Sequence, residues 1–186
     1  MTSSFFGDLS GEKEYRVRLE FSAPFQPSVL DSGLPLVSLL TEIEANIPSR
    51  TQDLRKEHGR IPYGSPLYWW ETTNSSGEVQ CQYIGKTVRL RPQSRFEQHA
   101  TVLKLLAACV NSRDIFVHFR LCSRLDIQLN NRRFGVEHLP PDQAAKVVSD
   151  IEAHLIYTHQ PLRNLEHKAK AKKPWKLFSV EHFLLG

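Results

Sequence analysis

The chain has 186 residues, of which 40% are hydrophobic and 24% charged, and its formal net charge is +4. This length and composition suit one soluble domain with or without an accessory arm, and they exclude collagen, coiled coils and wholesale disorder. No apolar run approaches the roughly 20 residues of a membrane-spanning helix, so we expect no membrane partner.

The cysteines and the N-terminus indicate a cytoplasmic location. The three cysteines are odd in number and lack a CxxC spacing, which argues against a disulfide framework and a zinc site. The first residues lack the basic and apolar segments of a secretory signal. We therefore expect a reducing, cytoplasmic compartment.

The excess positive charge lies late in the chain. Residues 162–176 hold six basic residues and one acidic residue, which leaves a net charge of −1 for the rest. A smaller run without any acidic residue covers residues 79–96 and contains Lys86, Arg89, Arg91 and Arg95. Both runs suit a polyanion such as DNA, although an isolated basic run is about as often only a solvated face.

A strand, a helix and a linker are predicted in the first part of the chain. Charged and apolar residues alternate over 15–21, which predicts a half-buried strand, and apolar residues at helical spacing predict a helix over 34–47. Residues 49–64 are polar and basic, as in a linker. We expect residues 1–60 to form an accessory region that recognises substrate, joins two copies of the chain as a homodimer, or covers the sheet.

A hairpin is predicted next. Its strands are residues 66–73 (PLYWWETT) and 79–87 (VQCQYIGKT), and the turn sequence NSSG separates them. A helix is expected over 92–111, followed by an apolar strand over 114–121.

An ambiguous segment and a helix are predicted before the basic tail. Residues 126–135 are ambiguous, although Asn130 and Asn131 suggest a hairpin turn. Pro140 and Pro141 begin a helix that is expected to run to about His159.

Three ionisable side chains fall on helix faces that are otherwise apolar. Glu152 is the only charge within the apolar arc of the helix over 141–159, and Arg95 and His99 lie one turn apart on the inward face of the helix over 92–111. A buried carboxylate is costly unless it is paired or binds a cation. The local alternatives are a buried salt bridge for Glu152, a solvent-directed Arg95 and a hydrogen-bonded core His99. Two such helices favour a shared site.

Five short motifs follow one another between residues 66 and 164. They are Pro66-Leu67-Tyr68, Tyr83-Ile84-Gly85 with Lys86, Arg95 to His99, Glu152 to Ile156, and Pro161 to Asn164. In order and spacing they resemble the motifs of the GIY-YIG nuclease superfamily. The second motif matches the family name in full. The first departs from it, because Pro66-Leu67 replaces Gly-Ile.

The resemblance implies an α/β fold of the α+β type. A small central, mostly antiparallel sheet of about three strands would be flanked by helices, with the N-terminal region as an extension. The nuclease domain would cover residues 61–165, and a basic C-terminal tail would cover residues 166–186.

The resemblance also implies a divalent-metal-dependent DNA endonuclease of restriction, repair, phage-defence or mobile-element type. Glu152 would hold one Mg²⁺ or Mn²⁺ ion, Tyr68 would act on the attacking water, and Arg95 would contact the scissile phosphate. The other candidates would position the water, relay its proton, supply positive charge or hold the site together, and they are Tyr83, Lys86, His99 and Asn164.

DNA contacts are expected from the two basic runs. The candidates are Arg89, Arg91, Arg163, Lys168, Lys170, Lys172, Lys173, Trp175 and Lys176. Trp175 could stack on a base or only dock the tail. Two other functions stay open: a non-catalytic nucleic-acid-binding module with a relic site, and a protein-interaction domain whose basic tail is a solvated face.

Overall fold

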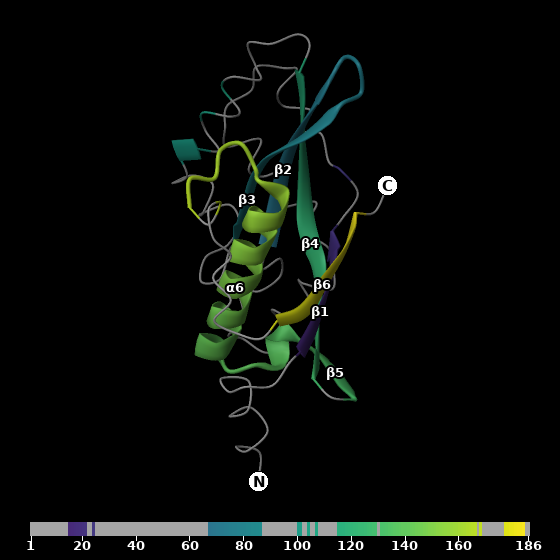
Figure 1. The fold of residues 1–186 in the computed structure, drawn as a ribbon, viewed down its shortest axis with the longest axis vertical. Coiled ribbons are helices and arrows are strands. Elements are labelled where there is room, and N and C mark those ends of the chain that lie inside the picture. Colours follow the sequence, from purple (N-terminus) through teal and green to yellow (C-terminus); the bar gives the residue numbers. More distant parts are fainter. Residues whose placement is uncertain are drawn as a thin grey trace, which may run out of the picture.

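The computed structural model describes residues 15–21, 24, 67–86, 100, 101, 104, 107, 115–129, 131–166, 168 and 177–184, the last range by its backbone alone. Its strands and helices are shown in Figure 1. They are β1 (Tyr15–Phe21), β2 (Leu67–Asn74), β3 (Val79–Lys86), β4 (Ile115–Leu129), β5 (Arg132–Gly135), the 3₁₀ helix η2 (Val136–His138), α6 (Pro141–His159) and β6 (Leu177–Leu184).

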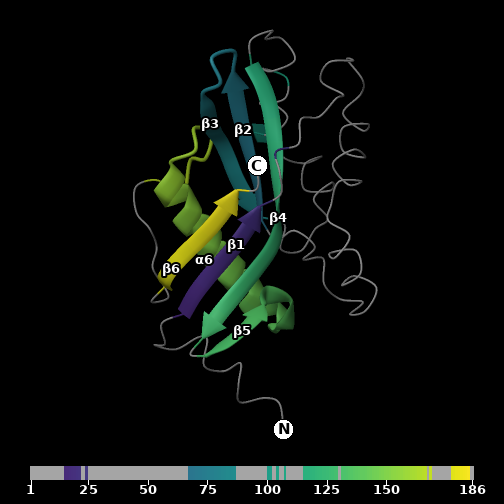
Figure 2. The same ribbon diagram turned by 90° about the vertical axis from the view of Figure 1, so that its right-hand side faces the viewer.

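The described strands form one sheet in the order β3-β2-β4-β1-β6, and β5 pairs with the end of β4. All neighbours are antiparallel except β1 and β6, which run parallel. β4 is 15 residues long and organises the sheet, because its first half pairs with β2 and its second half pairs with β1. Figure 2 shows β6, β1 and β4 side by side in front of α6.

The expected sheet of about three strands flanked by helices, with an N-terminal extension, is wrong, because the described sheet has six strands and α6 is the one α-helix among the described elements. β1 lies inside the sheet, between β4 and β6, and its side chains Val17, Leu19 and Phe21 are buried in the core. β4 continues past Leu121, where polar residues on one side of the strand obscure an apolar alternation on the other. Residues 177–184, expected within a tail, form β6.

The predicted hairpin is confirmed, since β2 and β3 pair antiparallel with a register shift between Trp70 and Glu71. The side-chain oxygen of Asn74 accepts hydrogen bonds from the backbone N–H groups of Ser76 (3.0 Å) and Glu78 (2.9 Å), which shapes the turn. Gly77 completes it with a φ of +82°, which favours glycine.

The predicted helix over 141–159 is also confirmed. Pro141 lies in its first turn, where a missing N–H costs nothing, and Gln160 ends it in the left-handed conformation with a φ of 47°. Its apolar arc, which includes Val147, Ile151 and Leu155, packs in the core with β1 and β4. We call the sheet face toward α6 the inner face and the opposite one the outer face.

Several predicted elements lie wholly or partly outside the described residues. Of the helix expected over 92–111, positions 100, 101, 104 and 107 are described and are helical. The helix over 34–47 and the linker over 49–64 lie outside. No helix among the described residues is both long and apolar enough to cross a membrane.

Candidate active site

Tyr68 and Tyr83 lie on adjacent strands and on the same face of the sheet. Their rings stack with centroids 6.1 Å apart and an interplanar angle of 24°. The face is the outer one, because the neighbouring Trp69 meets His159 of α6 at 4.7 Å and side chains alternate along a strand. Tyr68 is completely buried, and its ring lies 6.3 Å from that of Phe119 on β4.

Gly85 lies directly beneath the Tyr68 phenol. The two residues are cross-strand partners, and a Cβ atom on Gly85 would lie 2.4 Å from both Cζ and the hydroxyl oxygen of Tyr68. No side chain fits in that space without displacing the ring. The glycine of the Tyr83-Ile84-Gly85 motif therefore allows the hydroxyl of Tyr68 to reach the end of β3, one residue from Lys86.

Lys86 and Glu152 form an ion pair on the inner side of β3. The Lys86 ammonium lies 2.8 Å from Oε2 of Glu152 and donates a hydrogen bond to the Ser149 hydroxyl at 3.0 Å. The Glu152 side chain is 11% exposed and that of Lys86 33%. The pair explains how a carboxylate is accommodated in the apolar arc of α6, and it realises the salt bridge that was the local alternative for Glu152.

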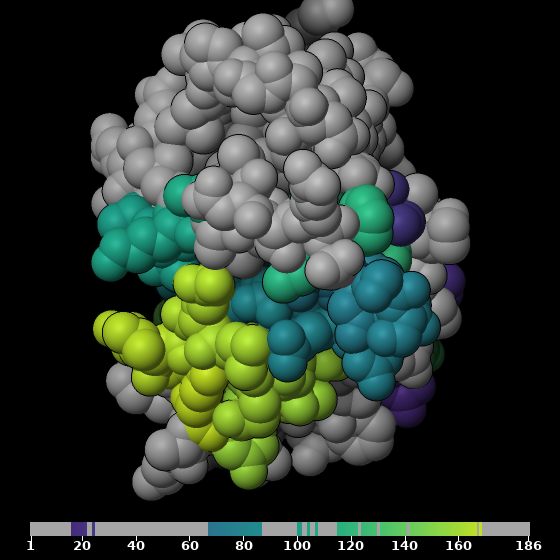
Figure 3. All heavy atoms as spheres, turned by 90° about the horizontal axis from the view of Figure 1, so that it is seen from above, coloured from purple at the N-terminus to yellow at the C-terminus, as the bar shows by residue number. Residues whose placement is uncertain are grey.

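Asn164 holds the chain after α6 against the edge of β3. Its side chain accepts the Ile84 N–H at 3.0 Å and donates to the Ile84 carbonyl at 2.9 Å. The backbone N–H groups of Leu162 and Arg163 add bonds to the carbonyls of Cys81 and Gln82. Residues 162–164 thus cover a strand edge that would otherwise expose backbone groups, and Figure 3 shows this segment beside the hairpin.

The arrangement places five of the seven predicted catalytic residues on or against the β2–β3 hairpin. The two tyrosines take the outer face, and the ion pair takes the inner face. The two groups lie on opposite faces of the hairpin, and Gly85, beneath the phenol of Tyr68, directly precedes Lys86 along β3. The other two predicted residues, Arg95 and His99, lie outside the described residues.

Two of the predicted DNA contacts are described. Nε of Arg163 donates a long hydrogen bond of 3.4 Å to Gln82 Oε1, and the Lys168 ammonium donates to the Leu162 carbonyl at 3.3 Å. Both residues therefore lie beside β3. The other candidates lie outside the described residues, and they are Arg89, Arg91, Lys170, Lys172, Lys173, Trp175 and Lys176.

A second ion pair, which sequence reasoning missed, joins β2 to β4. Nε of Arg120 lies 3.0 Å from Oε1 of Glu71, and both residues are buried. The available signal was an acidic residue within one apolar strand sequence and a basic residue within the other. Burial lowers the pKa of the neighbouring His118, and burial together with the Glu71 carboxylate raises the pKa of Cys81 to about 12. Cys81 is therefore a poor nucleophile near neutral pH.

A metal ion would find one carboxylate at this site. Within the described part of the chain, no group of three or more His, Cys, Asp or Glu residues could hold a metal. A hard carboxylate oxygen such as that of Glu152 suits Mg²⁺ or Mn²⁺, which commonly take their remaining ligands from water and substrate phosphate. The Lys86 ammonium already neutralises this carboxylate, so a metal ion would have to displace it from Glu152.

Comparison with protein-family models, curated proteins and solved structures gives no match for this chain. The resemblance to GIY-YIG nucleases therefore stays a prediction, and its weight comes from the five motifs and from the positions of Tyr68, Tyr83, Glu152 and Asn164, which belong to the four motifs that the structure describes.

Proposed function

We propose that the chain is a divalent-metal-dependent DNA endonuclease that hydrolyses phosphodiester bonds. One observation carries the proposal: the inward carboxylate of Glu152 lies against the strand that ends in Tyr83-Ile84-Gly85-Lys86. Four of the motifs that suggested the function, far apart in sequence, meet at that strand.

Glu152 would hold the Mg²⁺ or Mn²⁺ ion together with water and phosphate oxygens. The bound ion would supply charge neutralisation at the phosphate and stabilise the leaving 3′-oxygen. Asn164 keeps β3 in place through both polar groups of Ile84.

Tyr68 would accept the proton of the attacking water. An unperturbed tyrosine has a pKa of about 10, so neighbouring positive charge has to favour its phenolate. Arg95 would provide this charge, and Lys86 would add to it by leaving its inner-face ion pair with Glu152. Because the Tyr68 side chain is completely buried, the proposal also requires the side chains over it to move when substrate binds.

The second candidate is a non-catalytic DNA-binding module with a relic site. Two observations favour it. The carboxylate of Glu152 already forms an ion pair with the Lys86 ammonium, and Tyr68 has no exposed surface. In that case the ion pair would serve only to join α6 to β3.

Cleavage assays on variants test the proposal. Supercoiled plasmid and single-stranded DNA are incubated with Mg²⁺ or Mn²⁺ and wild type, Glu152→Gln, or Glu166→Gln as an exposed control with the same charge change. We expect wild type and Glu166→Gln to cut, and Glu152→Gln to bind DNA without cutting. Cutting by Glu152→Gln at the wild-type rate would contradict the metal role, and a wild type that binds but never cuts would favour the relic module.

Substitution of Tyr68 tests the proton-transfer role. Tyr68→Phe removes one hydroxyl and should lower the cleavage rate by roughly 10²–10⁴-fold while the melting temperature changes little. The matched control is Tyr157→Phe, because Tyr157 is exposed on α6 and should keep the wild-type rate. Equal rates for both variants would remove Tyr68 from the chemistry.

A further inference from the structure

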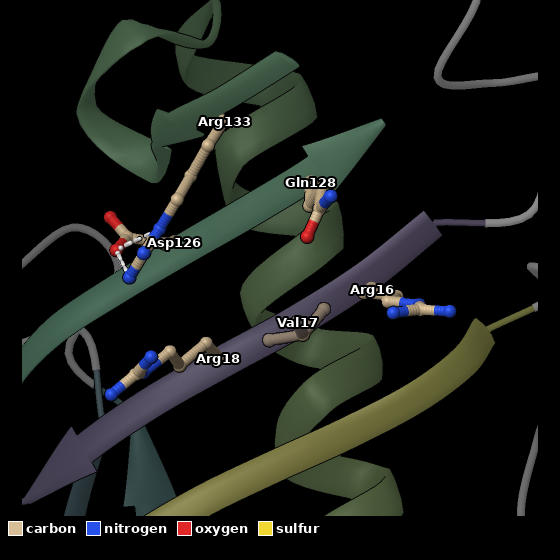
Figure 4. Close-up of a pocket in the computed structure, with 6 residues that line it drawn as sticks. All are labelled: Arg16, Val17, Arg18, Asp126, Gln128 and Arg133. Carbon is tan, nitrogen blue, oxygen red and sulfur yellow. Dashed lines mark hydrogen bonds and ion pairs between the residues drawn. The ribbon is translucent and has the colours of Figure 1, made fainter. Parts of the chain in front are cut away.

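The outer face of β1, β4 and β5 carries exposed arginines. Val17 and Leu19 are buried on the inner face, so the alternating Arg16 and Arg18 extend from the outer face. Together with residues of β4 and β5 they line a cavity of about 100 Å³ (Figure 4). Its lining residues are Arg16, Val17, Arg18, Asp126, Gln128 and Arg133.

Two acidic side chains on this face, Asp126 and Glu20, are paired with arginines. Asp126 is 6% exposed, and its Oδ2 atom accepts hydrogen bonds from Nε (2.8 Å) and Nη2 (2.5 Å) of Arg133. Nε of Arg124 lies 2.6 Å from the same oxygen, and Arg18 pairs with Glu20 at 3.5 Å. Arg16 adds a further positive charge, so the described side chains carry a net positive charge.

The spacing of these groups suits a row of phosphates. Arg16 and Arg18 are two residues apart on one strand, which separates them by about 7 Å, comparable to the separation of successive phosphates along a nucleic-acid strand. Each guanidinium can bind a phosphate through two N–H groups. Arg133 faces them across β4, where its register partner Gln128 adds an amide donor. On the other side of β1, Glu181 of β6 is the register partner of Arg18. This acidic residue marks the limit of the row of arginines.

We propose that this surface, defined by Arg16, Arg18, Gln128 and Arg133, binds the phosphate backbone of DNA. The choice of DNA rests on the proposed function, because the outer face is continuous from the tyrosine pair on β3 and β2, through β4, to these arginines. Phosphate contacts would hold the substrate on the sheet and carry no base sequence information.

Binding in a non-cutting background tests the proposal. Fluorescence anisotropy of labelled duplex and single-stranded DNA is measured over a salt series with Glu152→Gln protein, and then with Arg16→Gln and Arg18→Gln added. This pair leaves both contacts to Asp126 intact. We expect roughly tenfold or greater weakening for any sequence, and a flattening of log K against log salt by about one unit per lost phosphate contact.

The matched control is Arg132→Gln. Arg132 is exposed and belongs to the same short strand as Arg133. Its register partner Leu129 is a buried inner-face residue, so the Arg132 side chain extends from the inner face and not from the arginine surface. It should preserve the salt slope.

Two results would overturn the inference: an unchanged slope in the arginine variants, or equally tight binding of poly-glutamate. If wild type cuts DNA and the slope is unchanged, this inference fails alone. If the slope falls and wild type never cuts, the proposed function fails alone.

Discussion

Gly85 shows how a single missing side chain positions the candidate site. The phenol of Tyr68 occupies the space that a Cβ atom would need, and the ring stacks on Tyr83 in the same layer. The motif that resembles the nuclease family thus has a packing reason in this chain. The same residue is required whether or not the site is catalytic.

Gly85→Ala tests that packing. The added methyl would lie 2.4 Å from atoms of the Tyr68 ring, so we expect a loss of about 1–3 kcal/mol in the free energy of unfolding, measured in urea. In a Tyr68→Leu background the same change should cost much less, since the phenol is gone. The comparison is Gly77→Ala, where no atom lies within 4 Å and the cost comes only from the positive φ. An unchanged stability in Gly85→Ala would contradict the described contact.

At the scale of elements, local patterns were predictable and strand partners were not. The hairpin over 66–87 has a turn sequence between two strands, and α6 has prolines at its start and one apolar arc, so both follow from nearby residues. The predicted strand ended at Leu121, whereas β4 continues to Leu129, because Arg124, Asp126 and Gln128 interrupt the apolar run in the sequence. Those side chains extend from the outer face, while Leu125, Ile127 and Leu129 continue the core.

The Lys86–Glu152 pair joins β3 to α6, and its two ends should respond differently to substitution. Glu152→Gln leaves a lysine that is 33% exposed and can turn to water, so we expect a cost below about 1 kcal/mol. Lys86→Met leaves a carboxylate that is only 11% exposed, with a cost of about 1–3 kcal/mol. Urea unfolding of both variants measures this difference.

The same variants report on metal binding. Millimolar Mn²⁺ should raise the melting temperature of Lys86→Met, because its carboxylate no longer has a competing ammonium, and should leave Lys86→Met with Glu152→Gln unchanged. An equal response in the single and double variants would mean that the ion binds elsewhere.

At the scale of the whole molecule, the short motifs were visible in the sequence, whereas the sheet that holds them was not. Side chains such as Tyr83, Gly85 and Glu152 belong to short motifs whose spacing is visible in one sequence. Sheet order depends on pairings between distant segments, such as β1 with β6, and neither strand's own residues specify that partner. The arginine surface was hidden for the same reason, because β1 and β5 supply its parts separately.

The lysines expected to contact DNA lie between two described positions of the chain. Lys168 lies beside β3 at one side of the sheet, and Leu177 begins β6 at the other. The stretch between them lies outside the described residues and holds Lys170, Lys172, Lys173 and Lys176. These lysines would then add to, and in our expectation exceed, the contribution of the arginine surface.

Neutralising Lys170, Lys172 and Lys173 to glutamine should therefore weaken DNA binding uniformly across sequences. Each phosphate contact that is lost reduces the number of counterions released from DNA on binding. The slope of log K against log salt should therefore flatten by about one unit per lost contact. The measurement is the anisotropy titration in the Glu152→Gln background, with Arg132→Gln as the control for a single lost charge. A larger change than in the Arg16→Gln and Arg18→Gln pair would make the lysine segment the principal backbone contact. An unchanged slope would mean that the segment does not touch DNA, and the sheet surface would then have to supply the affinity.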